Sequence, residues 1–125
     1  MYTEIYPERK AYNRYDTGHF LVYLNEVVLE NHLSPDADEG VLPETGYQYT
    51  GTFPDGGTLI SAREATYDIF VSGLIRTRYS ADQVEAILLN VQSNNQERMP
   101  EFVSELDQLN AFREECKQIA AGLLQ

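Results

Sequence analysis

Two histidines and one cysteine are the side chains of this chain that most readily carry out catalytic or metal chemistry. His19 and His32 lie thirteen residues apart, and neither belongs to a metal-ligand motif such as His-Glu-x-x-His. Cys116 is the single cysteine and falls on the apolar face of an expected helix, where a thiol packs as a small apolar group. No Gly-x-Ser-x-Gly nucleophile motif is present. The sequence therefore predicts a non-enzymatic protein with no catalytic residues, cofactor or metal.

Two loops have a superficial likeness to ligand-binding motifs. Asp36 and Asp38 begin like a calcium loop, but Gly40 comes fifth and Tyr47 twelfth, where an EF-hand needs glycine sixth and an acid twelfth. The glycines of residues 54–57 lack the spacing and the lysine of a phosphate-binding loop. We expect a solvated acidic loop at 34–44 and a hairpin turn at 54–57.

Charge is the strongest global feature of the chain. Nine basic residues stand against twenty acidic ones, which gives a net charge of −11. A field of this sign repels phosphates and anionic lipids, so we expect neither nucleic acid nor membrane as a partner. The net charge can serve solubility alone, or it can mark an acidic inhibitor or nucleic-acid mimic that binds a basic protein.

Arg76 and Arg78, followed by Tyr79, are a local exception to the acidic composition. Cations offset the negative end of a helix dipole, which is one explanation for the pair. A contact with an anion or an acidic partner is the other. We retain all three residues as candidate interaction residues.

The stretch from Thr58 to Val91 has the clearest relation between sequence and structure. Ser61 with Glu64 and Ser80 with Gln83 each have the spacing of a capping box at the start of a helix. Helical spacing places one apolar stripe in each helix, formed by Tyr67, Phe70, Val71 and Leu74 and by Val84, Ile87, Leu88 and Val91.

A third helix is expected to begin near Pro100 and to carry an apolar seam along its whole length. The seam packs within the domain or pairs with a second copy of the chain. For pairing with a second copy, we select Leu106, Phe112 and Ile119 as candidate contact residues. The seam consists of Phe102, Leu106, Leu109, Phe112, Cys116, Ile119 and Leu123.

The N-terminal half is expected to form strands. Residues 46–53 alternate between apolar and polar, and residues 58–60 are expected to return antiparallel to them after the turn at 54–57. Residues 19–33 predict one bent strand, or two strands that turn near Asn25, with a helix as the alternative. Four tyrosines and three basic residues suggest an extended arm over residues 1–16, which packs on its own domain or a neighbouring subunit, or stacks on single-stranded bases.

These elements predict a single α+β domain over residues 1–125. The arm would cover 1–16, the strands and acidic loop 17–60, and the helices 61–125. A small antiparallel sheet from the N-terminal half would then pack against three helices from the C-terminal half. The N-terminus lacks the apolar core of a signal peptide, and the longest apolar run is Phe20–Leu24, so we expect a cytoplasmic protein.

GYQYTGTFPDGGTLI, followed by YDIFVSGLIRTRYSADQVEAILLN, resembles small uncharacterised proteins encoded in phage and mobile-element regions of gut bacteria. The segment LDQLNAFREECKQIA is similar to the closing helix of those proteins and of phage tail-fibre assembly proteins, although it lacks the tryptophan often found in that helix. The resemblance covers about the last two-thirds of the chain and implies an accessory or virion-associated role with no known activity. We expect a structural or interaction protein of phage or mobile-element origin that binds protein partners and self-associates as a homo-oligomer.

Overall fold

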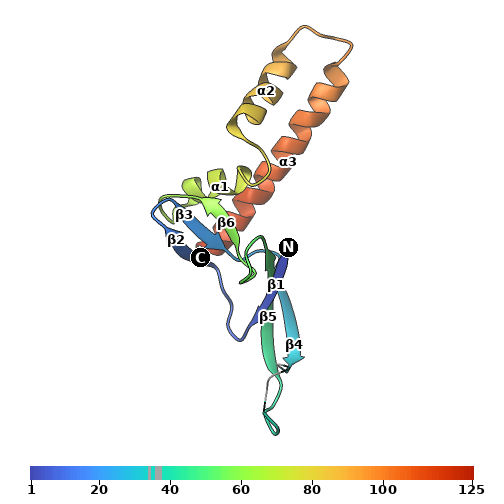
Figure 1. The fold of residues 1–125 in the computed structure, drawn as a ribbon. Helices are drawn as coiled ribbons and strands as arrows, with labels where there is room; N and C mark the ends of the chain where they lie inside the picture. The colour runs from blue at the N-terminus through green and yellow to red at the C-terminus, as the bar shows by residue number, and fades with distance from the viewer. Residues whose placement is uncertain (34, 36–37) are drawn as a thin grey trace. The chain divides into compact units, whose positions relative to one another are not determined.

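The computed structural model describes residues 1–33, 35 and 38–125. The chain divides into two compact units, an N-terminal unit (Met1–Leu59) and a C-terminal unit (Ile60–Gln125). The described residues form two small antiparallel sheets of three strands each and three helices (Figure 1). All three helices lie in the C-terminal half of the chain. The predicted α+β class is therefore confirmed, whereas the single domain over 1–125 stays a prediction.

The first sheet has the strand order β1-β5-β4, from β1 (Tyr2–Tyr6), β5 (Glu44–Gly51) and β4 (Val27–His32). β5 is the central strand, and its register places Tyr6 opposite Tyr47. Both β1 and β4 are edge strands. The predicted strand over 46–53 is confirmed, although both its start and its end lie two residues earlier than expected.

The second sheet has the order β2-β3-β6, from β2 (Tyr12–Asp16), β3 (His19–Val22) and β6 (Thr58–Ser61). Residues 1–16 therefore supply β1 and β2 and are not a free arm. Residues 19–33 form the two strands β3 and β4, with Asn25 between them at φ 58°, a left-handed conformation that asparagine tolerates. The prediction of two strands turning near Asn25 is confirmed, and the helical alternative is wrong.

The expected hairpin between the strands at 46–53 and 58–60 is wrong, because β5 and β6 belong to different sheets. The turn itself forms as expected: the Gly56 N–H donates to the Phe53 carbonyl at 2.9 Å, and Gly56 has φ 83°. Gly51, the last residue of β5, lies so close to the Gly57 backbone that a Cβ at this position would collide with it.

The C-terminal unit contains α1 (Tyr67–Ile75), α2 (Ala81–Gln92) and α3 (Met99–Leu123). α1 and α2 both pack against α3, with α1 beside its C-terminal half and α2 beside its N-terminal half (Figure 1). The predicted start of the third helix is confirmed, because Pro100 lies in the first turn of α3.

One of the two predicted capping boxes is present. The Ser80 hydroxyl accepts from the Gln83 N–H at 3.1 Å, and the Gln83 side chain accepts from the Ser80 N–H at 2.8 Å. The box at Ser61 and Glu64 is wrong, because Ser61 ends β6 and α1 begins only after Thr66, whose side chain makes no cap bond. Strand pairing holds Ser61 in the sheet and so delays the helix.

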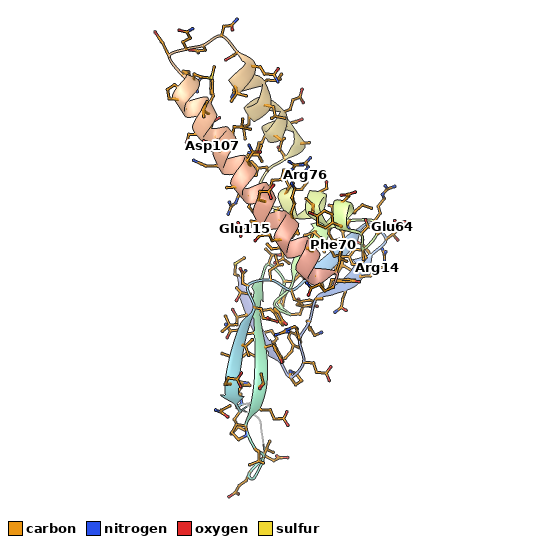
Figure 2. The ribbon with its side chains drawn as sticks, turned by 180° about the vertical axis from the view of Figure 1, so that it is seen from behind. Arg14, Glu64, Phe70, Arg76, Asp107 and Glu115 are labelled. Atoms are coloured by element: carbon orange, nitrogen blue, oxygen red, sulfur yellow. The ribbon has the colours of Figure 1, made fainter. Side chains whose placement is uncertain are left out.

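The core of the C-terminal unit is built from α1 and α3. Of the predicted stripe on α1, Phe70, Val71 and Leu74 are buried and Tyr67 is 43% exposed (Phe70 is labelled in Figure 2). α3 buries five side chains, which are Phe102, Leu109, Cys116, Ala120 and Leu123.

α2 contributes less to this core than its stripe predicts. It has no buried residue, and its stripe members Val84, Ile87 and Val91 are half-buried. Leu88, the fourth member, remains exposed. The packing of α2 on α3 therefore leaves apolar side chains of α2 at the surface.

Candidate interaction surfaces

Three of the residues selected from the sequence meet in the C-terminal unit. Arg78 and Tyr79 lie in the link between α1 and α2, and both contact Phe112 on α3. The Arg78 guanidinium carbon lies 4.3 Å from the centroid of the Phe112 ring, and the Tyr79 ring centroid lies 5.8 Å from it at an angle of 49°. The Arg78–Phe112 contact is a cation–π interaction.

The other selected residues are not part of this contact. Arg76 is exposed and forms the C-cap of α1 (labelled in Figure 2). Leu106 and Ile119 lie on α3 and are half-buried, as Phe112 is. The seam of α3 thus packs within the C-terminal unit, and these three positions present only part of each side chain to solvent.

The largest exposed apolar side chains of the helices lie elsewhere, at positions that the sequence analysis did not select. Leu88 and Leu89 on α2 are 43% and 56% exposed, and Val103 on α3 is 44% exposed. Leu88 fits the spacing of the apolar stripe on α2, so the sequence predicts that it is buried. The adjacent pair Leu88–Leu89 is the sequence feature that could have predicted this exposure, because one face of a helix cannot bury two successive residues equally well.

Cys116 is fully buried on α3, with 1% of its surface exposed. Burial, together with the charge of Glu115, raises the pKa of its thiol to about 11. The thiol is therefore protonated at neutral pH and is shielded from solvent, as expected for a packed side chain.

The tyrosines of the N-terminal unit form an ordered aromatic cluster, made of Tyr6, Tyr23 and Tyr49. Their ring centroids lie between 5.7 and 6.3 Å apart, and the Lys10 ammonium lies 4.4 Å from the Tyr6 ring centroid. These three residues come from three different segments. The tyrosine-rich N-terminus is visible in the sequence, but the contact of Tyr6 with Tyr23 and Tyr49 arises only from the tertiary fold.

Each hydroxyl of the cluster has a specific acceptor. Tyr6 donates to the Asp55 carbonyl at 2.5 Å, and Tyr23 donates to Asp55 Oδ2 at 2.9 Å. Tyr49 donates to Glu26 Oε1 at 2.7 Å and accepts from the Lys10 N–H at 2.8 Å.

These environments stabilise the protonated tyrosines. Burial and the hydrogen bond to Asp55 raise the pKa of Tyr23 to about 12. Burial and the hydrogen bond to Glu26 raise the pKa of Tyr49 to about 12. Every buried side-chain nitrogen or oxygen of the described residues has a hydrogen-bond partner. The cluster is thus a satisfied structural network, in which the phenols are poor acids at neutral pH.

A groove of about 600 Å³ lies on the sheet β1-β5-β4. Its lining comes from the end of β1, the start of β5, the end of β4 and the loop that follows β4. The apolar lining side chains include Ile5, Leu33, Val41 and Leu42. The sequence predicts only an acidic loop at 34–44 and gives no sign that Val41 and Leu42 line a groove.

The described parts of the chain hold neither a cluster of metal-ligand side chains nor a membrane-spanning helix. No group of three or more His, Cys, Asp or Glu side chains there could hold a metal ion. None of the helices there combines the length and apolar character of a membrane span. The motif with Asp36 lies partly outside the described residues, because Asp36 is not among them.

Comparison of the chain with protein-family models, with curated proteins and with solved structures gives no match.

Proposed function

We propose that this protein is a non-enzymatic interaction protein that self-associates through the outer surface of the helical pair α2–α3. The observation that carries the proposal is that α2 buries none of its residues and leaves Leu88 and Leu89 exposed side by side. Single exposed apolar residues are common on protein surfaces, whereas adjacent ones on a poorly buried helix indicate a contact surface.

A second copy is the partner that best fits these helices. α3 carries both signs of charge, with Arg113 and Lys117 among its acidic residues and Arg98 at its N-cap (Asp107 and Glu115 are labelled in Figure 2). A two-fold pairing can place opposite charges of the two copies around the apolar residues. A stable dimer buries about 800 Å² per partner, so the contact must extend beyond the two leucines.

The resemblance of residues 46–60 and 67–90 to proteins of phage and mobile-element regions supports an accessory or structural role. An accessory protein of that kind acts in the cytoplasm of the host or as part of the virion. Self-association through an apolar helical surface suits either place.

The test is the absolute mass in solution, by light scattering on a sizing column, at low and high salt. We expect a dimer or larger assembly that resists salt, because apolar contacts are not screened. The variant Leu88→Gln/Leu89→Gln should be monomeric, since glutamine keeps helix propensity and removes the apolar contact. The matched control is Val27→Thr/Val28→Thr, which changes an adjacent exposed apolar pair on β4 in the other unit.

The control should keep the mass of the unchanged protein. A monomer at both salt concentrations for the unchanged chain would contradict self-association. If the β4 variant disrupts the assembly and the α2 variant does not, the contact between copies lies on the edge strand β4 instead.

A further inference from the structure

The floor of the groove on β1-β5-β4 is made by the two edge strands leaning over the central one. Gly46 of β5 is buried, and a Cβ at this position would lie 3.0 Å from Ile5 Cγ2 and 3.2 Å from His32 Cδ2. Ile5 of β1 and His32 of β4 can approach each other over Gly46 only because this residue has no side chain. Ile5 contributes an aliphatic side chain to this floor, and His32 contributes its imidazole ring.

One wall of the groove consists of apolar side chains that solvent reaches easily. Leu33 is 48%, Val41 50% and Leu42 79% exposed, and all three line the groove. Covering such side chains gains about 25 cal/mol for each square ångström of apolar surface removed from water. The groove is therefore suited to one or two apolar side chains of a ligand.

The charge of the groove has one sign. Glu4 and Glu44 are among its lining residues, and no Lys or Arg is among those that the structure describes there. Residues 34–57, which include Val41 and Leu42 of this wall, carry five acidic residues and no basic one. A ligand with positive charges next to its apolar groups complements this lining, whereas a nucleic acid is repelled.

The position of β1 favours an extended ligand. Glu4, Ile5 and Tyr6 belong to an edge strand that pairs, within the described part of the chain, with β5 alone, and Pro7 follows them in the lining. An edge strand leaves alternate backbone N–H and C=O groups outside the sheet pairing, where a peptide can add a further strand. On β1 the Ile5 N–H donates to Glu4 Oε1 at 3.1 Å, and a bound strand would replace this local hydrogen bond. In an added strand, successive side chains point to opposite sides. A peptide in which apolar and basic residues alternate would therefore present its apolar side chains on one side and its basic side chains on the other.

We propose that this groove binds an extended segment of a protein partner in which apolar residues alternate with Lys or Arg. The apolar side chains enter the groove over Ile5 and His32, against Leu33, Val41 and Leu42. The cationic side chains lie near Glu4 and Glu44. This binding site is separate from the self-association proposed above and does not depend on it.

The test is isothermal titration calorimetry of the full chain with three blocked six-residue peptides. One alternates leucine and lysine, one alternates leucine and glutamate, and one is hexalysine. We expect the leucine–lysine peptide to bind, with an affinity that falls as salt rises, because exposed charges are screened. The leucine–glutamate peptide should not bind, and hexalysine should bind at least about tenfold more weakly because it lacks the apolar side chains.

Two variants locate the site. Glu4→Gln/Glu44→Gln should lower the affinity for the leucine–lysine peptide about tenfold, and Leu42→Ser should lower it to a similar extent. The charge-matched control is Glu64→Gln/Glu97→Gln, which removes two exposed carboxylates from the other unit and should leave the affinity unchanged. All positions are exposed, so circular dichroism should show the same fold for each protein.

Three outcomes overturn the proposal. The first is no binding of the leucine–lysine peptide. The second is equal binding of hexalysine, which would show attraction to net charge alone. The third is an equal loss of affinity in the control variant, which would show that Glu4 and Glu44 make no specific contribution to peptide binding. None of these results bears on the mass in solution, so the two proposals fail independently.

Discussion

The guanidinium of Arg78 stacks on the ring of Phe112, with 4.3 Å between the guanidinium carbon and the ring centroid. The sequence indicates the two residues for different reasons, Arg78 as a cation at a helix end and Phe112 as a member of the apolar seam of α3. Their contact connects the link between α1 and α2 to the middle of α3. Arg78 therefore serves the packing of the C-terminal unit, which accounts for one member of the pair Arg76 and Arg78.

Replacing Arg78 should lower stability more than replacing its neighbour. Arg78→Ala removes a cation–π contact and is expected to lower the free energy of unfolding by about 0.5–1 kcal/mol. Arg78→Lys keeps the charge without the flat guanidinium, so it should lower the free energy of unfolding less than Arg78→Ala does. Urea unfolding followed by circular dichroism measures both.

Arg76→Ala is the matched control, because Arg76 is exposed two residues earlier. Its effect should stay within about 0.5 kcal/mol. Equal losses for the two alanine variants would mean that net charge, and not the stacking on Phe112, determines the effect.

The two capping boxes show which features the sequence could predict. The box at Ser80 and Gln83 needs only groups three residues apart, and it forms. The box at Ser61 and Glu64 has the same local spacing, but Ser61 belongs to a strand of a sheet with β2 and β3. Local patterns therefore predicted the helices well and their starts only where no distant strand competed.

The groove and the tyrosine cluster could not be predicted from local patterns. Ile5, His32 and Gly46 come together only through the register of three strands. The period-two pattern of β5 indicates that its residues alternate between faces but not which strands lie beside it. The selected arginines and seam residues are placed as expected on or beside helices, whereas the exposed pair Leu88–Leu89 depends on how closely α2 packs on α3.

Two helical glycines should respond in opposite ways to alanine. In α1, a Cβ on Gly73 would lie 2.6 Å from the Ser61 carbonyl oxygen, a backbone atom that cannot move aside easily. In α3, a Cβ on Gly122 meets nothing within 4 Å. We expect Gly73→Ala to lower the free energy of unfolding by about 1–3 kcal/mol through overpacking.

Gly122→Ala, the matched control, should leave stability unchanged or raise it by up to about 1 kcal/mol, because alanine has the higher helix propensity. Thermal and urea unfolding of both variants test the pair. A stable Gly73→Ala variant would show that α1 does not approach Ser61 as closely as described.

High pH should destabilise the N-terminal unit through Tyr23 and Tyr49. Both have a pKa of about 12 in the folded chain, against an ordinary value near 10. The folded chain therefore holds these two protons more tightly than the unfolded chain. Their contribution to stability is complete below about pH 10 and is lost as pH rises to about 12.

The unfolding free energy should consequently fall between about pH 10 and 12, by at most about 1.4 kcal/mol per pH unit for each tyrosine. Urea unfolding over this range measures the slope. Tyr23→Phe/Tyr49→Phe should be less stable at neutral pH, because Asp55 and Glu26 lose their donors, but its slope should be shallower. Tyr15→Phe is the control for an exposed tyrosine, and a wild-type slope in the double variant would contradict the assignment.

Cys116 should react with a thiol reagent only when the C-terminal unit opens. The thiol is fully buried, and with a pKa of about 11 only about one molecule in a thousand carries the reactive thiolate at pH 8. We expect slow reaction with a disulfide reagent in buffer and rapid, stoichiometric reaction in urea, followed by absorbance. Cys116→Ala gives the baseline without signal.

The same experiment tests the stacking on Phe112 in a second way. When opening and closing are faster than labelling, the labelling rate follows the equilibrium population of the open form. Arg78→Ala, with a loss of about 0.5–1 kcal/mol, should label about two- to fivefold faster, and Arg76→Ala should label at the unchanged rate. Immediate labelling of the unchanged chain in buffer would contradict the burial of Cys116. Equal rates for the two arginine variants would contradict a specific contribution of Arg78 to the packing of the link on α3.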